Sequence, residues 1–426
     1  MTSSTPALAA PSTKAVGNQS GHRWKILSLG VMANASFSAA FAGIPVTAIF
    51  MRADYRLDNA QLGAVLGALG LGVALSELPW GLLTDRWGDR RVLLCGLFGT
   101  ALALAMMALW LVPDHGRSPS ILALASGLLL VGLLGGSVNG ASGRAVMAWF
   151  REGERGLAMS IRQTAVPLGG GLGAVVLPTL AAAHGFACVY ALLALFCALS
   201  AVLAWRWLHE PPLIASSVAT EVAQTSALRN GKVWRVALAT GILCFPQVSV
   251  LTFATIFLHD VGHASLMFIS LTMAAIQIGA ALTRICSGRW TDRRGNRRSY
   301  LRACSALSVL LYTALAALVA CVAGPWPPSL LLAVALLLTA AGICASAWHG
   351  VAYTELATLA GAGQVGTALG LGNTCVFLVF FLAAQAVPAL LSWQSWPAVW
   401  LAGAVAALLA WRIFLKPLAT HNGTMA

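Results

Sequence analysis

The sequence lacks charge. Only 9% of its 426 residues are Asp, Glu, Lys or Arg, whereas 59% are hydrophobic. About a quarter of the residues of a soluble domain are charged, so this composition excludes a chain whose whole surface faces water. Apolar runs of about 20 residues recur along the chain, and each is long enough to cross a hydrocarbon core about 30 Å thick. The sequence therefore predicts an all-α membrane protein.

The sequence also lacks the short motifs of several function classes. Its nine cysteines include no C-x-x-C pair, and we interpret them as small buried hydrophobic residues, neither metal ligands nor a disulfide framework. A G-x-x-x-x-G-K-[ST] motif is absent, which leaves an ATP-driven mechanism without support. No cluster of catalytic residues stands out either. We expect a protein that is not an enzyme and needs no cofactor or bound metal.

Twelve apolar stretches predict twelve transmembrane helices. A polar leader, residues 1–25, precedes them and is expected to be a disordered cytoplasmic tail, since it does not resemble a cleaved signal peptide. The stretches are residues 26–51, 60–80, 92–112, 121–149, 156–182, 185–207, 234–258, 264–288, 300–323, 328–356, 365–390 and 394–415.

The net charge of +13 is distributed in a way that indicates topology. With the N-terminus inside, the cytoplasmic segments hold 20 of the 26 Lys and Arg residues, and the outer loops hold three. An excess of Lys and Arg in cytoplasmic loops is the positive-inside rule, which explains the charge without a nucleic-acid partner. The sequence predicts a multi-pass protein of a bacterial inner (plasma) membrane with both termini in the cytoplasm.

One loop occurs twice. Gly81, Asp85 and Gly88 follow the second span, and Gly288, Asp292 and Gly295 follow the eighth, each 207 residues after its counterpart. Such a period indicates a tandem duplication of a six-helix unit. A second correspondence, at an offset of 210 residues, relates spans four and five to spans ten and eleven. We therefore expect bundles at residues 26–208 and 234–416, a cytoplasmic linker at 209–233 and a cytoplasmic tail at 417–426.

The repeated pattern G-x-x-x-D-R-x-G-x-R-R resembles the signature loop of the major facilitator superfamily, and the resemblance covers nearly the whole chain, from Trp24 to about Lys416. It implies two pseudo-symmetric six-helix bundles, with spans one, four, seven and ten around a central cavity. The segment from Trp348 to Glu355 is in addition similar to a W-N-G-x-x-x-x-E pattern of bacterial organic-anion and cyanate-type permeases, although His349 replaces the Asn.

The resemblance also implies a gate. It places Asp85 at the cytoplasmic start of span eleven and Asp292 at that of span five, where a carboxylate meets unpaired N–H groups and the positive end of the helix dipole. Such contacts would join the bundles and break when the cytoplasmic side opens. The residues that we assign to gating are Asp85, Arg86, Gly88, Arg91, Asp292, Arg293, Gly295, Arg298 and Glu77.

Polar side chains inside the spans are the candidates for substrate contact. An ionisable group that faces lipid at mid-depth costs about 2.5 kcal/mol or more, so these groups are expected to face the bundle interior, although an Arg near a helix end can also snorkel into the headgroups. Polar groups of this kind also serve as helix-packing contacts. The candidates are Arg144, Arg284, Arg162, Asn34, Gln247, Gln277, Trp348 and Asn373.

Two residues of the tenth predicted span are candidates for proton coupling. His349 titrates near neutrality without a large shift, and Glu355 is a carboxylate at the end of the same span. The alternatives are a hydrogen-bonded interior histidine and a partner of the gate, respectively. The predicted boundaries leave no Asp or Glu in the middle third of any span, which argues against a cavity built for a cation.

These residues favour a secondary transporter that takes up a small organic anion with protons. Three Arg and one His face only two carboxylates within the spans, and guanidinium groups bind carboxylates bidentately. The expected partners are an anionic small molecule, protons and the lipid bilayer. The alternative is a proton-coupled multidrug or metabolite exporter.

We predict that both termini and the loop near Trp234 are cytoplasmic, while Asp54 and Asp114 are outside. Single cysteines at these positions in a Cys-free background, labelled with a membrane-impermeant maleimide, test the topology. An outward-facing C-terminus would refute it.

Overall fold

The computed structural model describes residues 13–113, 118–209, 226–322, 326–393 and 395–416. All regular elements in these residues are helical. Most of the expected linker and the C-terminal tail lie outside this part of the chain, as does Asp114. The helices are α1 (Thr13–Val46), α2 (Ala48–Asp54), α3 (Asn59–Trp87), α4 (Asp89–Trp110), α5 (Ile121–Gly135), α6 (Ser137–Trp149), α7 (Arg155–Gln163), α8 (Ala165–Trp207), η1 (Ala227–Arg229), α9 (Gly231–Asp260), α10 (Leu266–Arg294), α11 (Arg297–Ala320), α12 (Pro328–Ser346), α13 (His349–Ala360), η2 (Ala362–Gln364), α14 (Val365–Trp393) and α15 (Trp396–Ile413).

Eleven stretches of these helices are long and apolar enough to cross a membrane. One of them, Arg155–Trp207, has 53 residues and contains the backbone break at Gly185, where φ is 72°. Glycine adopts a positive φ at little cost, so one crossing ends here and the next begins. The twelve predicted spans therefore match eleven stretches of which one crosses twice.

Local capping explains where several helices begin. Asp58 and Gln61 form a reciprocal capping box at the start of α3. Ser120 caps α5 and Ser265 caps α10, each by accepting a hydrogen bond from a backbone N–H of the first turn. These side chains satisfy N–H groups that have no partner within the helix. They place helix starts at loops that connect apolar spans.

The structure corrects two predicted boundaries. Helix α1 begins at Thr13, so residues 13–25 of the expected disordered leader are helical; Arg23 anchors this end by pairing with Glu154 at 2.6 Å. Helix α3 continues to Trp87 instead of ending at residue 80, because the turn comes only at Gly88, where φ is 85°.

The expectation of uniformly buried cysteines is also wrong. Cys95, Cys188, Cys286 and Cys321 are exposed. All four belong to α4, α8, α10 or the end of α11, and a thiol is apolar enough to face lipid.

Three predicted spans are each built from two consecutive helices. Span four changes from α5 to α6 at Gly136, span five from α7 to α8 at Thr164, and span ten from α12 to α13 near Ala347. Gly136 and Ser346, the last residue of α12, are equivalent at the 210-residue offset. The interruptions of spans four and ten therefore follow the internal repeat, whereas that of span five does not, because its equivalent Thr374 lies within the continuous helix α14.

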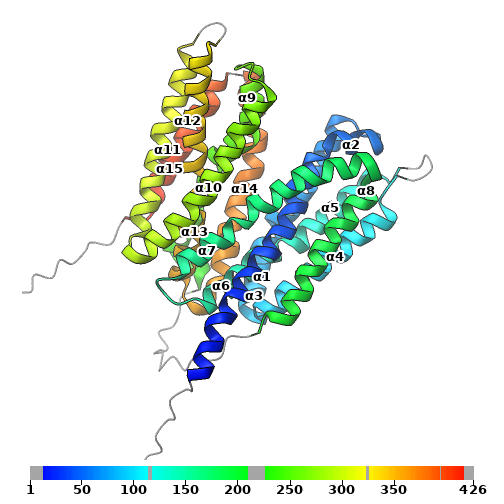
Figure 1. Cartoon of the computed structure of the whole chain (residues 1–426), viewed down its shortest axis with the longest axis vertical. Coiled ribbons are helices and arrows are strands. Elements are labelled where there is room, and N and C mark those ends of the chain that lie inside the picture. Colours follow the sequence, from blue (N-terminus) through cyan, green and yellow to red (C-terminus); the bar gives the residue numbers. More distant parts are fainter. Residues whose placement is uncertain (1–12, 114–117, 210–225, 323–325, 394, 417–426) are drawn as a thin grey trace, which may run out of the picture.

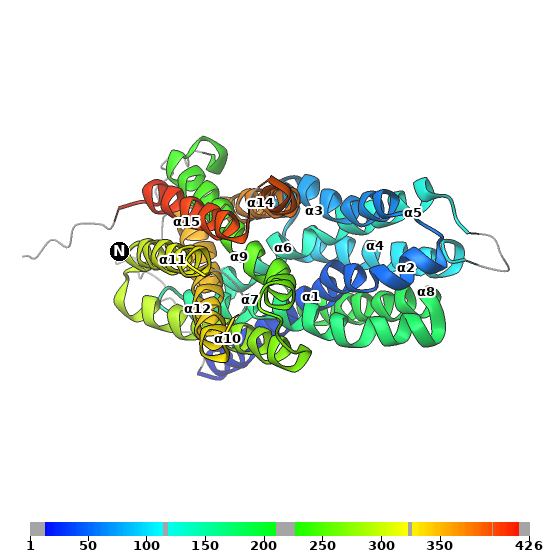
Figure 2. The ribbon, with the colours of Figure 1, turned by 90° about the horizontal axis from the view of Figure 1, so that it is seen from above.

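The helices form two bundles that meet at one end. Helices α1–α8 make one bundle and α9–α15 the other, and Figure 1 shows them converging at the end where α1 begins and diverging toward α2 and the start of α12. Figure 2, from above, shows the bundles side by side. The converging end is the predicted cytoplasmic side, and we call the opposite end the predicted outer side.

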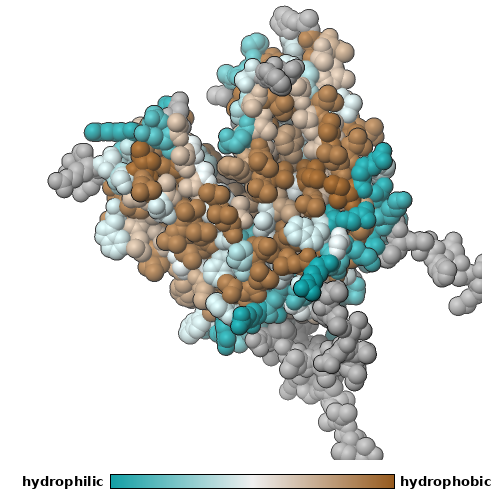
Figure 3. Space-filling view, turned by 180° about the vertical axis from the view of Figure 1, so that it is seen from behind, coloured by the Kyte–Doolittle hydropathy of each residue, from teal (hydrophilic) through white to brown (hydrophobic). Residues whose placement is uncertain are grey.

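The surface of the molecule agrees with a membrane location. Figure 3 shows a broad hydrophobic area over the flanks, hydrophilic residues along the predicted cytoplasmic edge, and a notch between the two bundles that opens to the predicted outer side. Large apolar side chains such as Leu109, Val175 and Leu310 are exposed. The conformation is thus closed on the predicted cytoplasmic side and open on the other.

Close backbone contact between α3 and α5 holds part of the first bundle together. A Cβ added at Gly132 would lie 2.2 Å from the carbonyl oxygen of Leu69, and one added at Gly72 would lie 2.4 Å from that of Leu129. Small residues at such positions let helix backbones approach in membranes.

We predict that Gly132→Ala lowers stability by about 1–3 kcal/mol, because the added methyl group meets backbone that cannot rotate away. Gly67→Ala, on the same helix α3 with no atom within 4 Å of its added Cβ, is the matched control and should be neutral or stabilising by up to about 1 kcal/mol. Melting of the two purified variants in one detergent compares them. Equal melting temperatures would contradict the assigned contact.

Candidate functional site at the contact between the bundles

The two bundles meet along two seams related by the internal repeat. We define the first seam as the contact of α3 with α14, and the second seam as the contact of α10 with α7. On α3 the contacting positions are Glu77, Gly81 and Asp85; their equivalents on α10, 207 residues later, are Arg284, Gly288 and Asp292. Residues four apart lie on one helix face. Each seam therefore has three successive levels of contact.

The outermost level on the predicted cytoplasmic side consists of carboxylates at helix starts. Asp85 accepts hydrogen bonds from the backbone N–H groups of Gly366 at 2.8 Å and Thr367 at 2.6 Å. Asp292 accepts from those of Gly156 at 2.9 Å and Leu157 at 2.8 Å. These are the contacts that the family resemblance implied. Each carboxylate satisfies free N–H groups and lies at the positive end of a helix dipole.

Glycines form the middle level. A Cβ at Gly81 would lie 2.5 Å from the carbonyl oxygen of Gly366, and one at Gly288 would lie 2.4 Å from that of Gly156. Any larger side chain would push the helices apart and separate the carboxylates from their donors. In the repeated loop, glycine is thus required for close helix packing at Gly81 and Gly288 as well as for turns.

The other predicted gating residues have diverse environments. Gly88 and Gly295 turn the chain with φ of 85° and 63°. Arg86, Arg91 and Arg293 are exposed and have no hydrogen bond or ion pair in the described part of the chain.

Arg144 lies among the carboxylates at the predicted cytoplasmic side. Its guanidinium is 2.6 Å from Asp89 and 3.5 Å from Asp85. It is near the end of α6, at the depth of these carboxylates, and they neutralise its charge. These pairs argue against the prediction that Arg144 binds substrate, because its charge already has partners in this conformation.

Glu355 also belongs to the predicted cytoplasmic side. It accepts a hydrogen bond from Arg298 Nε at 2.7 Å. This contact favours the alternative of a gate partner over the proton-coupling assignment. The reason is its place on α13, opposite the repeated loop, which supplies Arg298.

The innermost level of the first seam is a buried polar network centred on Glu77. This side chain is fully buried. One carboxylate oxygen accepts a hydrogen bond from the Asn139 amide at 2.5 Å, and the other accepts from the Asn373 amide at 3.1 Å. Asn373 in turn accepts a hydrogen bond from the Tyr353 hydroxyl. Glu77 thus joins α6 of its own bundle to α14 of the other.

This position corrects the depth expected for Glu77. Because α3 runs from Asn59 to Trp87, Glu77 falls inside its middle third and not at its end. It belongs to the seam and not to the gate loop. Contrary to the expectation from the predicted boundaries, one carboxylate does fall within the middle third of its helix, at the edge nearer the predicted cytoplasmic side.

Arg162 completes the network on the side of the first bundle. It donates from Nη2 to the Asn139 carbonyl at 2.6 Å, and from Nε and Nη2 to the Ser142 hydroxyl at 3.0 and 2.8 Å. Only 2% of the residue is exposed. Its charge acts on Glu77 without a direct ion pair, so carbonyl and hydroxyl oxygens solvate it.

Arg284 occupies the innermost level of the second seam. It donates from Nε to the Ser346 carbonyl at 2.7 Å and from Nη1 across the seam to the Gln163 carbonyl at 2.9 Å. It is 4% exposed, and no carboxylate of the described residues forms an ion pair with it. Nη2 has no acceptor in the same part of the chain. The site holds a nearly buried positive charge without a counter-ion.

His349 lies next to Arg284. Its Nδ1 is 3.1 Å from the Ser346 carbonyl, which Arg284 also contacts, and its ring stacks on Trp348 with centroids 3.7 Å apart. Trp348 is fully buried. The structure thus brings Arg284, His349 and Trp348 together.

Three predicted substrate residues are not joined to this site by any hydrogen bond among the described residues. Gln247 on α9 is buried and Gln277 on α10 is half-buried. Asn34 on α1 is fully buried, with neither amide atom hydrogen-bonded.

Asn139 and Tyr353 are members of the network that the sequence analysis missed. The repeat contained a signal for Asn139, because it is equivalent to His349 at the 210-residue offset. The same repeat relates Glu77 to Arg284 and Gln163 to Asn373. Tyr353 had no comparable signal, since a tyrosine in an apolar span is common.

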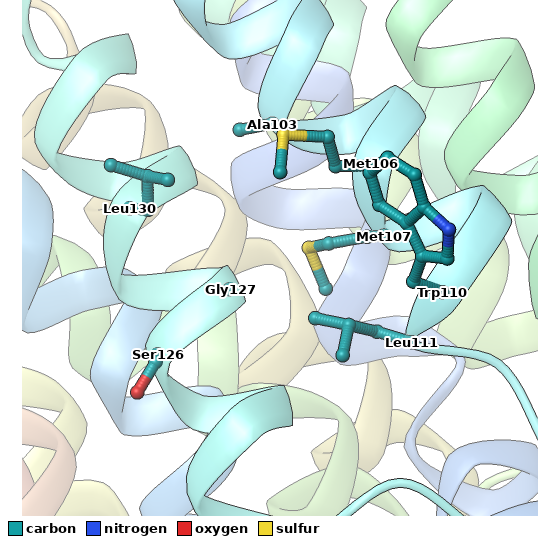
Figure 4. Close-up of a pocket in the computed structure, with 8 residues that line it drawn as sticks. All are labelled: Ala103, Met106, Met107, Trp110, Leu111, Ser126, Gly127 and Leu130. Atoms are coloured by element: carbon teal, nitrogen blue, oxygen red, sulfur yellow. The ribbon is translucent and has the colours of Figure 1, made fainter.

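An apolar groove lies away from the seams, between α4 and α5 (Figure 4). Met106 and Trp110, which line it, are 43% and 65% exposed on the hydrophobic flank. The groove has no charged side chain. Its chemistry fits contact with lipid and offers nothing to hold an ion.

The structure has two bundles that are related by an internal repeat and joined by duplicated contacts between a carboxylate and a helix start. A comparison of the sequence with protein-family models identifies a family with which this architecture agrees. The sequence model described as "Major Facilitator Superfamily" matches residues 27–313, more than half of the chain. The chain belongs to the major facilitator superfamily. It is therefore a multi-pass membrane transporter and not an enzyme.

Other members of the superfamily show how far the similarity extends. The uncharacterised MFS-type transporter Rv2994 of Mycobacterium tuberculosis is 31% identical over 390 residues, covering 89% of this chain and 82% of that protein. The probable galactarate/D-glucarate transporter GudP of Bacillus subtilis is 26% identical over 149 residues, covering 35% of this chain and 32% of that protein. The solved structure of the proton:xylose symporter XylE superposes with a TM-score of 0.72 at 15% identity, covering 94% of this chain and 97% of that one.

We predict that Asp85→Asn loosens the first seam. The amide presents an NH₂ group to an N–H donor, and a hydrogen bond to a charged group contributes about 1.5–3 kcal/mol. A cysteine at the buried Thr84 position, in a Cys-free background, should then be alkylated from the cytoplasmic side about tenfold faster or more. Transport turnover should fall, with substrate affinity within a few fold.

Asp260→Asn is the matched control, because this carboxylate is exposed at the predicted outer end of α9. It should leave labelling unchanged. A wild-type labelling rate in Asp85→Asn would mean that the carboxylate does not hold the seam closed.

Proposed function

We propose that the protein is a secondary transporter that takes up a small organic anion together with protons by alternating access. The proposed location is the inner (plasma) membrane of a bacterium, with both termini cytoplasmic. The observation that carries the proposal is Arg284, a nearly buried guanidinium that has no carboxylate partner among the described residues and lies where the two bundles meet.

The electrostatic argument starts from the cost of an unpaired charge. A buried cation without a counter-ion is expensive, and the two carbonyl oxygens that Arg284 contacts compensate only in part. An anion that enters from the open side would supply the missing charge. A guanidinium binds carboxylates in a planar, bidentate geometry, which supports an organic acid as the substrate.

The surroundings of Arg284 fit this ligand. His349 offers a second polar group next to the guanidinium, and its ring is held by stacking on the buried Trp348. Because Arg284 bonds across the second seam, an anion bound to it would bear directly on the contact between the bundles. The similarity to the probable galactarate/D-glucarate transporter GudP supports the same substrate class.

The alternative is a proton-coupled multidrug or metabolite exporter. Such a cavity would hold an acidic residue ready for a cation, and Glu77 is a carboxylate at suitable depth. However, both oxygens of Glu77 already accept hydrogen bonds, and the charge of Arg162 acts on it. This arrangement favours a structural or coupling role for Glu77 over recognition of a cationic substrate.

The test of the proposal is transport into proteoliposomes under an imposed pH gradient, with a panel of carboxylates, other small anions and cationic drugs. Accumulation of a carboxylate, dependent on an acidic exterior, is the expected result. Export of a cation with no movement of any anion would overturn the proposal.

We predict that Arg284→Ala weakens binding of the transported anion by roughly 30- to 150-fold. A charge-assisted hydrogen bond in a partly dry cavity contributes about 2–3 kcal/mol, and each 1.4 kcal/mol is about tenfold in affinity. Arg284→Lys should recover only part of the loss, because it keeps the charge but not the planar fork.

Arg144→Ala is the matched control, since Arg144 is paired with Asp89 and Asp85. It should leave the affinity within a few fold. Binding and melting temperature are measured on the same purified variants. A lower melting temperature with normal affinity in Arg284→Ala would assign Arg284 a purely structural role.

A further inference from the structure

Glu77 and Arg284 are equivalent positions that carry opposite charges. They are 207 residues apart. Their partners across the seams are Asn373 for Glu77 and Gln163 for Arg284, and these two partners are 210 residues apart. Glu77 accepts from the Asn373 side chain on the first seam, and Arg284 donates to the Gln163 backbone on the second. At the same level of the repeat, one seam is thus held by an acid and the other by a base.

The chemistry of the two contacts differs in what releases them. An ionised carboxylate is a strong acceptor at both oxygens; once protonated, it is a weaker acceptor and carries an O–H donor that needs an acceptor of its own. Asn373 presents its NH₂ group to Glu77 while its carbonyl oxygen accepts from Tyr353, so an O–H on the facing carboxyl oxygen meets a donor and not an acceptor. A guanidinium cannot lose its proton in a protein, but an anion competes with a neutral carbonyl for it, because charge-assisted bonds are stronger.

We propose that Glu77 is the proton-coupling residue, and that its protonation weakens the first seam while anion binding at Arg284 weakens the second. The part of this inference that concerns anion binding rests on the proposed function, whereas the effect of Glu77 protonation on the first seam can be tested without any substrate. Each of the two events shifts the equilibrium toward opening of the predicted cytoplasmic side, and their free energies add. Either ligand alone gives only a small open fraction because one seam stays intact, which favours coupled transport and limits leakage.

The direction of the effect is the one that uptake requires. In the conformation described here, the notch between the bundles opens to the predicted outer side (Figure 3). A proton that binds Glu77 in this state removes part of the contact with Asn373 and favours opening to the other side. Proton binding therefore loosens the closed seam ahead of release into the cytoplasm.

Few of the side chains that face Glu77 can change their own charge, so Glu77 is the group in this network that can gain a proton. The charged and titratable groups that act on it are Arg162 from α7 and Tyr353 from α13. The neighbouring helices α6 and α14 present the uncharged amides of Asn139 and Asn373. The two amides also form a natural comparison, because Asn139 bonds Glu77 within one bundle and Asn373 bonds it across the seam.

The experiment measures opening without any substrate. Spin labels at the exposed positions Arg206 on α8 and Arg412 on α15 report the separation of the bundles in nanodiscs between pH 5 and 9. In the wild type, the open fraction should rise as the pH falls, by at most about tenfold per pH unit for one proton. Glu77→Gln should make the open fraction independent of pH.

The two amide variants keep the test decisive if Glu77→Gln folds poorly. Asn373→Ala should flatten the pH dependence, because the carboxyl group remains but no longer bonds across the seam. Asn139→Ala should retain a pH dependence, since it removes a bond within one bundle. Equal behaviour of the two variants, or a pH response that persists in Glu77→Gln, would overturn the proposal.

A transport assay distinguishes failure of this proposal from failure of the proposed function. Once an anion is known, Glu77→Gln should exchange it across the membrane but fail to accumulate it under a pH gradient. If no anion is transported while the labels respond to pH through Glu77, the substrate assignment fails and the seam assignment stands. Proton-driven accumulation in Glu77→Gln would leave the anion assignment intact and refute the role of Glu77.

Discussion

The structure depends on one interaction used twice: a carboxylate of one bundle bonded to the free N–H groups at a helix start in the other. These contacts bring α3 against α14 and α10 against α7 closely enough that only glycine fits beneath them. Everything further into the membrane follows from this approach. The amide of Asn373 reaches Glu77, and Arg284 reaches the Gln163 carbonyl, only because the backbones are already in contact.

The architecture was predictable because its causes are local or repeated. The length of the apolar stretches predicts the spans, and the uneven distribution of Lys and Arg predicts the orientation. The duplicated loop predicts the two bundles and the family. The boundaries were less predictable, since hydropathy marks where lipid ends and not where a helix ends. Helix α3 continues past its apolar part to Trp87, and this extension places Glu77 within the body of the helix instead of at its end.

The candidate site was harder to predict, because pairing between distant residues decides it. Arg144 and Arg284 look alike in sequence, yet Arg144 meets Asp85 and Asp89 while Arg284 meets only carbonyl oxygens. Nothing in the spacing distinguishes them. The internal repeat contained more information than the motifs did, since the 207-residue offset alone relates Glu77 to Arg284. Composition and periodicity do not show which polar groups each of these two charges meets in the folded chain.

The opposite charges at equivalent positions also bear on the history of the chain. A dimer of identical six-helix units would place the same side chain at both seams, either two acids or two bases. An acid on one seam and a base on the other require two copies of the unit whose sequences have diverged. Glu77 and Arg284 therefore mark a property that an ancestral symmetric assembly could not have had, and the division of labour between the seams arose after the two copies began to diverge.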